Sequence, residues 1–153
     1  MSIHIQHHKN KKVKIINRYH PDAETVVAAN PDLIIGWKST FASVLKKPTA
    51  WWNERGVRTY VVSTSNHLHD KGRIEDECRY LDDMGQIFDV REKTDRMIRE
   101  IHDELSRTQK LVKGRASQAV MVVEPEGKAF YNYDDRWVVG DMVEQLGGYV
   151  PAG

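Results

Sequence analysis

Short apolar runs alternate with amphipathic stretches along the whole of this 153-residue chain. An apolar run bounded by glycine or polar residues is typical of a buried strand, whereas apolar residues three and four positions apart indicate one face of a helix. Regular alternation of the two patterns predicts an α/β fold with a mainly parallel sheet. The strand candidates are residues 33–36, 59–63, 119–123 and 128–133, with a weaker candidate at 13–16.

The helical stretches begin and end at residues with known capping or breaking preferences. Asp22 can cap the first helix, and Pro48 should interrupt the second, which Gly56 ends. Gly147 and its neighbouring glycine are suited to the end of the last helix. The predicted helices are residues 22–29, 41–55, 74–88, 90–112 and 136–146.

The longest of these helices, residues 90–112, would extend roughly 35 Å at 1.5 Å per residue. Because this is longer than an average globular helix, we expect it to cross between two bodies or along a whole face. No internal repeat or low-complexity linker precedes or follows it.

Composition excludes several classes of partner. The net charge is +1, from 23 basic and 22 acidic residues, so nucleic acid and anionic membranes are not expected partners. Cys78 is the only cysteine and cannot form an internal disulfide. The first residues lack the apolar segment of a secretory signal. The sequence therefore leaves open a cytoplasmic location or a missing export segment.

Candidate ligand-binding residues follow three of the predicted strands, where ligands bind in open α/β sheets. Tryptophan and tyrosine rings offer flat apolar faces, and lysine and arginine offer positive charge. The candidates are Trp37, Lys38 and Ser39, then Ser65, Asn66 and His67, and finally Tyr133, Asp134 and Arg136. Each segment also has a structural interpretation: Trp37 packing on a helix, a polar surface loop at His67, and Asp134 or Asp135 as a helix N-cap.

Catalytic motifs do not emerge from the sequence. It contains no G-x-S-x-G elbow, no Walker A loop and no G-x-G-x-x-G after a strand. Cys78 falls on the apolar stripe of its helix, which favours a core thiol over a nucleophile. His67 and His69 could hold a metal or act as a base, but two histidines define no site. We therefore predict a protein that is not an enzyme, with no catalytic residue, no metal ligand and no required cofactor.

The order of several segments resembles the substrate-binding proteins of metal-chelate ABC importers, of the siderophore, haem or cobalamin type. DAETVVAANPDLIIGW (residues 22–37) is similar to a family stretch in which a short helix leads into a strand. GVRTYVV (residues 56–62), MGQIFD (84–89) and FYNYDDRWVVGDMVEQLGG (130–148) follow in the family's order. The resemblance covers roughly residues 15–149.

This resemblance implies a Rossmann-like lobe, a long inter-lobe helix and an incomplete second lobe, a truncated periplasmic-binding-protein-like fold. The implied division is a flexible leader (1–12), a partial N-terminal lobe (13–89), a connecting helix (90–113) and the start of a second lobe (114–153). The implied function is binding of a ferric or cobalt chelate between lobes for ABC import, impaired by truncation, in a periplasmic or cell-surface location. Trp37 matches a ligand-facing loop of cobalamin-binding members, and residues 134–137 match a second-lobe loop that often faces the ligand.

The resemblance also implies an ABC permease partner, which family members engage through a surface acid on each lobe. Here Ser43 stands near the first-lobe position, and the second-lobe position lies beyond the last residue. The alternative function is an interaction module, because an incomplete lobe leaves sheet edges and apolar faces uncovered. We therefore expect a homo-oligomer.

Overall fold

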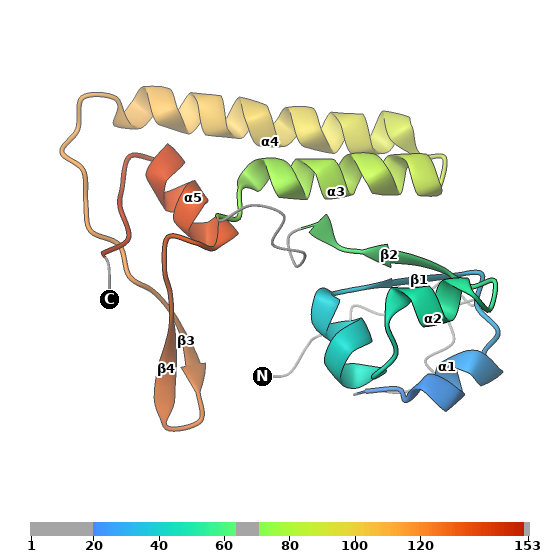
Figure 1. Ribbon diagram of the computed structural model, residues 1–153. Coiled ribbons are helices and arrows are strands. Elements are labelled where there is room, and N and C mark those ends of the chain that lie inside the picture. The colour runs from blue at the N-terminus through green and yellow to red at the C-terminus, as the bar shows by residue number, and fades with distance from the viewer. Residues whose placement is uncertain (1–19, 64–70, 152–153) are drawn as a thin grey trace, which may run out of the picture. The chain divides into compact units, whose positions relative to one another are not determined.

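The computed structural model describes residues 20–63 and 71–151. The strand candidate at 13–16 and the candidate ligands Ser65, Asn66 and His67 lie outside these residues. The elements, shown in Figure 1, are α1 (Ala23–Ala28), β1 (Leu33–Gly36), η1 (Thr40–Val44), α2 (Thr49–Asn53), β2 (Arg58–Val61), α3 (Ile74–Ile87), α4 (Arg91–Val112), β3 (Val122–Glu126), β4 (Ala129–Tyr133) and α5 (Val138–Gln145).

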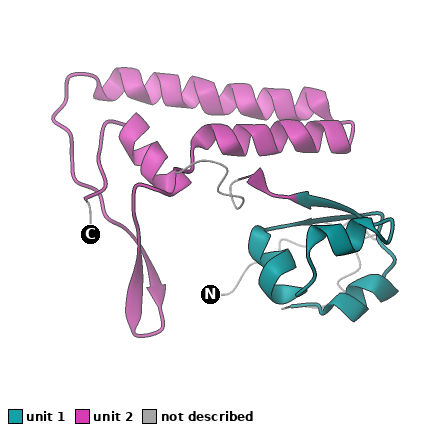
Figure 2. Cartoon of the chain, in the orientation of Figure 1, with its two compact units in different colours: residues 1–60 teal, residues 61–153 magenta. Residues whose placement is uncertain are grey.

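The chain forms two compact units, Met1–Tyr60 and Val61–Gly153, which Figure 2 colours separately. The boundary between them falls inside the predicted N-terminal lobe of residues 13–89. The predicted connecting helix is present as α4 and lies wholly within the second unit. Its role as a connection between lobes stays a prediction.

The first unit contains β1 and all of β2 except its last residue, Val61. The two strands pair in a two-stranded sheet, with short helical segments between them in the sequence. Asp22 caps α1 as predicted, since its carboxylate accepts a hydrogen bond from the Thr25 backbone N–H at 2.7 Å. The expected break at Pro48 is confirmed, because η1 ends before it and α2 begins directly after it. Gly56 takes the left-handed backbone conformation, φ 78°, that lets the chain turn from α2 toward β2.

Three apolar side chains are buried among the residues of the first unit that the structure describes. Phe41 and Leu45 are each 4% exposed, and Trp52 is fully buried. Trp51 packs edge-on against Trp52, with ring centroids 4.8 Å apart, and the Arg55 guanidinium lies 3.7 Å above the Trp51 ring. Trp52 is therefore a central core residue of this unit.

In the second unit α3 and α4 lie side by side and run in opposite directions (Figure 1). Asp89, in the left-handed conformation at φ 53°, makes the tight turn between them. The helices approach closely at Gly85, where Thr94 of α4 fills the space that a larger residue would need. No helix within residues 20–63 and 71–151 combines the length and apolar character needed to cross a bilayer.

The remainder of the second unit is an antiparallel hairpin of β3 and β4 followed by α5. Here the prediction was partly wrong: the strand expected at 119–123 begins at Val122 and continues to Glu126. The expected mainly parallel arrangement does not extend to this pair, because a short turn through Gly127, φ 59°, can only return the chain antiparallel. Ala119 instead makes a single parallel bridge with Tyr149.

Candidate functional site

The hairpin and the start of α5 enclose a shallow pocket with a volume of about 420 Å³. We call it the aromatic pocket. Its lining combines three aromatic rings, a proline and two carboxylates, all from the second unit: Glu124, Pro125, Glu126, Tyr131, Tyr133 and Trp137. Its size falls within the range of small-molecule sites in proteins.

The three rings of the pocket contact one another edge to face. The centroid of Tyr133 lies 4.9 Å from that of Tyr131 and 5.6 Å from that of Trp137. Tyr131 and Trp137 are 6.2 Å apart, and all three interplanar angles lie between 71° and 84°. Edge-to-face packing is the favoured arrangement of aromatic pairs, so the rings hold each other in fixed orientations.

The pairing of the strands explains why these side chains meet. Glu124 is opposite Tyr131, and Val122 is opposite Tyr133. Because side chains alternate between the two faces of a strand, these four residues share one face of the hairpin. The neighbouring residues, among them Phe130, belong to the opposite face, where Phe130 is 72% exposed.

A hydrogen bond fixes Tyr133 in the pocket. Its hydroxyl donates to a carboxylate oxygen of Glu124 at 2.6 Å, across the two strands. This bond raises the pKa of Tyr133 above its ordinary value, with smaller contributions from desolvation and from the Glu124 charge. Tyr133 is therefore a neutral hydrogen-bond donor over the whole physiological range, with a Glu124 carboxylate oxygen as its acceptor.

Asp134 and Arg136 form a local ion pair beside the pocket. The Asp134 carboxylate accepts from the Arg136 Nε at 2.9 Å, from its Nη2 at 2.6 Å and from its backbone N–H at 3.0 Å. The side-chain hydrogen bond, followed by the backbone one, lowers the pKa of Asp134. The expectation that Asp134 or Asp135 caps the last helix is wrong, since Trp137 occupies the N-cap position and no side chain caps it.

Contacts with the segment just before α3 and with α5 hold the loop of residues 134–137 in place. The Gly72 N–H donates to the Arg136 carbonyl at 2.8 Å, and Lys71 pairs with Glu144 at 2.7 Å and with Asp135 at 3.7 Å. Gly140, on the first turn of α5, lies so near the loop that an added Cβ would be 2.6 Å from the Asp135 Cα. The loop orientation therefore depends on a glycine at that position.

Of the three predicted groups of site residues, the group of Tyr133, Asp134 and Arg136 lies in the same unit as the pocket. Tyr133 lines the pocket. Asp134 and Arg136 lie in the sequence between two of its lining residues, Tyr133 and Trp137. Trp37, Lys38 and Ser39 follow β1 in the first unit, where all three are exposed, Trp37 at 55%. Their role as ligand contacts stays a prediction, as does that of the residues near His67.

Sequence reasoning missed Glu124, Pro125 and Glu126 because it ended the strand at residue 123. The sequence signal for the missed residues was the Glu-Gly-Lys turn at residues 126–128. A hairpin around this turn pairs residue 126 with residue 129, and this register puts Glu124 opposite Tyr131. It also missed a second cluster in this unit. Glu75, Cys78 and His102 have one donor atom each within 4.8 Å of one another.

Comparisons with known proteins agree with this architecture. Residues 4–152 match the family described as periplasmic binding protein. A periplasmic binding protein from Veillonella parvula is 26% identical with a TM-score of 0.73, covering 86% of this chain and 42% of that one. No curated protein sequence gives a significant match.

Two further solved structures show the same fold at lower identity. The siderophore binding protein BauB, bound to ferric iron and two acinetobactin molecules, is 19% identical (TM-score 0.66; 95% of this chain, 49% of that one). The haem-binding protein RhuT from Roseiflexus sp. is 15% identical (TM-score 0.63; 91% and 51%). The chain thus spans about half the length of these proteins. The predicted periplasmic-binding-protein-like fold is confirmed, and the chain belongs to the periplasmic binding protein family.

Proposed function

We propose that the chain is a non-catalytic binding component that holds a metal chelate, a ferric siderophore, haem or cobalamin, for import by an ABC permease. The aromatic pocket is the observation that carries this proposal. Family membership supports it, as do the ligands named for two structural relatives, a ferric siderophore complex and haem. A periplasmic or cell-surface location belongs to the same proposal.

The pocket suits a rigid ligand with apolar faces. Tyr131 is 42% exposed, and its ring is held in place by Tyr133 and Trp137. A ligand that covers this ring therefore costs the side chain little conformational entropy. The Tyr133 hydroxyl and the pocket carboxylates add polar contacts that fix orientation. A chelated metal brings its own donors, so no protein ligand to that metal is required.

The charges around the pocket narrow the class of chelate. Glu124 and Glu126 line it, while the Arg136 guanidinium is already paired with Asp134. Among the residues that the structure describes, the pocket is therefore lined by two carboxylates and by no cationic side chain. Neutral or cationic chelates, such as ferric hydroxamates, should bind better here than highly anionic ferric tris-catecholates. Lys38 of the first unit stays a separate predicted ligand contact.

Calorimetric titration of the 153-residue chain with ferric hydroxamate, ferric catecholate, haem and cobalamin tests the proposal. Replacing Tyr131 with leucine should weaken binding of the preferred chelate by about tenfold, through loss of aromatic stacking. Phe130→Leu is the matched control, since Phe130 is an exposed aromatic on the opposite face of the same strand. No saturable binding of any chelate by a folded sample would contradict the proposal, as would equal losses in the two variants.

A second candidate function is self-association through the opposite face of the hairpin. Met121, Val123 and Phe130 are 69%, 47% and 72% exposed, and exposed apolar patches are typical of protein–protein interaction sites. A second copy of the chain could cover this face and form the expected homo-oligomer. Light scattering over a concentration series should then give a mass above that of the monomer, and Phe130→Glu should return it to the monomer. A monomer at every concentration would exclude this function.

A further inference from the structure

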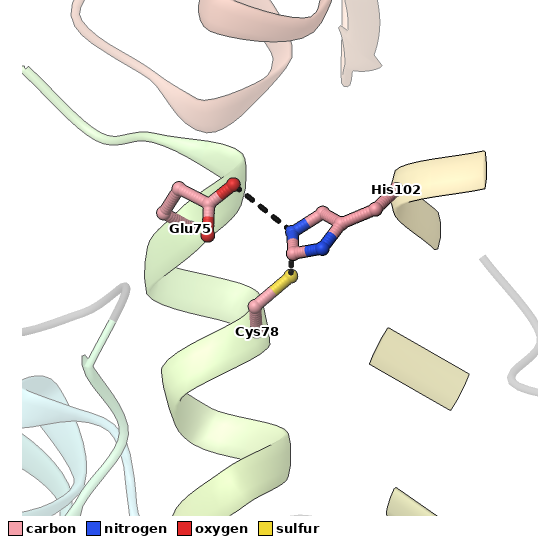
Figure 3. A group of neighbouring side chains, drawn as sticks. All are labelled: Glu75, Cys78 and His102. Carbon is pink, nitrogen blue, oxygen red and sulfur yellow. Dashed lines mark hydrogen bonds and ion pairs between the residues drawn. The ribbon is translucent and has the colours of Figure 1, made fainter. Parts of the chain in front are cut away.

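A second cluster of chemically active side chains lies on the paired helices of the same unit, separate from the aromatic pocket. Glu75 and Cys78 are three residues apart on α3 and therefore share a face, and His102 approaches them from α4 (Figure 3). The His102 Nε2 lies 3.1 Å from a Glu75 carboxylate oxygen and 3.7 Å from the Cys78 sulfur. Both partners thus converge on one nitrogen atom.

These separations match those between ligands of a tetrahedral metal ion. Bond lengths of about 2.3 Å to sulfur and 2.0–2.2 Å to nitrogen or oxygen place such ligand atoms roughly 3.3–3.6 Å apart. The nitrogen–oxygen and nitrogen–sulfur distances of 3.1 and 3.7 Å lie close to these values. All three donor atoms lie within 4.8 Å of one another, and the exposed Glu75 side chain is free to adjust.

Charge and burial at the cluster also favour a cation. Burial raises the pKa of the Cys78 thiol, and the nearby negative charges of Glu75 and Glu77 raise it further. The same negative charges would attract a divalent ion, which displaces the thiol proton on binding. A buried, protonated thiol is in turn a poor nucleophile, so a catalytic cysteine–histidine pair does not fit this geometry.

We propose that Glu75, Cys78 and His102 form a binding site for one zinc-class divalent cation that ties α3 to α4. Thiolate, imidazole and carboxylate are the donors such ions prefer. The Glu75 and His102 side chains are 59% and 46% exposed, so water can reach the fourth position from that side. This site is distinct from the proposed chelate pocket, because it takes the bare ion and uses protein donors.

Cobalt(II) titration of the full chain under metal-free, thiol-free reducing conditions tests this site. Because Cys78 is the sole cysteine, a thiolate-to-cobalt charge-transfer band can arise only from it. We expect the band to saturate at one ion per chain, together with the intense visible bands of tetrahedral cobalt, and to disappear when zinc is added. Other histidines, including His4, His7 and His8, could bind cobalt but would not produce this band.

Variants identify the remaining ligands. His102→Asn and Glu75→Gln should each weaken cobalt affinity by about tenfold to a hundredfold or more, and both change exposed side chains, so folding should be retained. Glu77→Gln is the matched control, because it removes a neighbouring charge without removing a donor of the cluster. Absence of the charge-transfer band would overturn the proposal. So would a band whose affinity is unchanged in both His102→Asn and Glu75→Gln, which would leave the cluster as a polar contact between helices.

Discussion

The close approach of Gly140 to the loop beside the aromatic pocket predicts a specific effect of Gly140→Ala. The added Cβ would be 2.6 Å from the Asp135 Cα, 2.9 Å from the Asp134 carbonyl oxygen and 3.0 Å from the Asp135 carbonyl carbon. All three are backbone atoms, so no side-chain rotation can relieve the contact and the loop must move. Alanine would otherwise favour the helix, because it is a better helix former than glycine.

The size of the effect follows from these opposing terms. Overpacking of a closely packed site costs about 1–3 kcal/mol, and the gain in helix propensity is at most about 1 kcal/mol. With the full propensity gain subtracted, we therefore expect a net loss in the free energy of unfolding of up to about 2 kcal/mol, read from the midpoint of urea denaturation. Because the displaced loop leads directly into Trp137, chelate affinity should fall as well.

Gly114→Ala is the control for Gly140→Ala. Gly114 has φ 80° and no atom within 4 Å of an added Cβ. Its substitution should cost about 1–2 kcal/mol through backbone strain alone, and chelate affinity should be unchanged. A Gly140→Ala protein as stable as the unaltered chain, with unchanged chelate affinity, would show that the loop is not held against α5 as described.

Three further changes test the packing and electrostatics of the second unit. Gly85→Ala should lower the free energy of unfolding by about 1–3 kcal/mol. Adding Thr94→Ala should restore part of that loss, because the Thr94 hydroxyl occupies the space of the new methyl group. Urea denaturation of the single and double variants measures both effects, and a double variant no more stable than Gly85→Ala would contradict the prediction. Asp141→Ala should cost about 0.5–2 kcal/mol, since Asp141 accepts from the first backbone N–H of α3 at 2.9 Å; an unchanged unfolding midpoint would contradict it. Glu124→Gln should lower the pKa of Tyr133 toward its ordinary value, because the carboxylate hydrogen bond raises it. Because the pKa of Tyr133 is raised, this hydrogen bond stabilises the folded state below about pH 10, and the stabilisation is lost as the pH rises through the pKa of the folded state. Phenolate absorbance measures the pKa, with Tyr133→Phe identifying the contribution of Tyr133. Identical titration curves for the unaltered and Glu124→Gln proteins would refute the prediction.

The helices were the part of the fold that periodicity predicted best. The expected ranges 74–88 and 90–112 agree with α3 and α4 to within a residue at each end. Both helices carry apolar residues at three- and four-residue steps over several turns, so their pattern is long enough to exclude a strand. Pro48 and Gly56 act through local backbone geometry, which is why their effects were also predictable.

The hairpin shows where local pattern was insufficient. Residues 119–123 are apolar, and such a run predicts a buried strand, yet Met121 and Val123 are 69% and 47% exposed. The strand position depends on pairing around the Gly127 turn, which involves residues that look polar in isolation. Glu124 becomes the neighbour of Tyr133 only through this pairing. The sequence therefore predicted Tyr133 as a site residue but did not predict Glu124.

The local sequence pattern also could not predict side-chain clusters formed by residues that are far apart in the sequence. The position of Cys78 on the apolar stripe predicted a core thiol, and its 5% exposure confirms the burial. Its neighbour His102 lies 24 residues away in the sequence, so the contact depends on the register of α3 against α4. That register is fixed by the turn at Asp89 and the close contact at Gly85, neither of which periodicity reveals.

The central claim, that the aromatic pocket holds a metal chelate, is tested most directly by the indole N–H resonances of the four tryptophans. A gallium-substituted hydroxamate siderophore is a diamagnetic replacement for the ferric form and can be titrated into labelled protein. The Trp137 indole signal should shift progressively and saturate, while that of the fully buried Trp52 should stay in place. A stationary Trp137 signal with this ligand, with cobalamin and with a diamagnetic metalloporphyrin would contradict the claim.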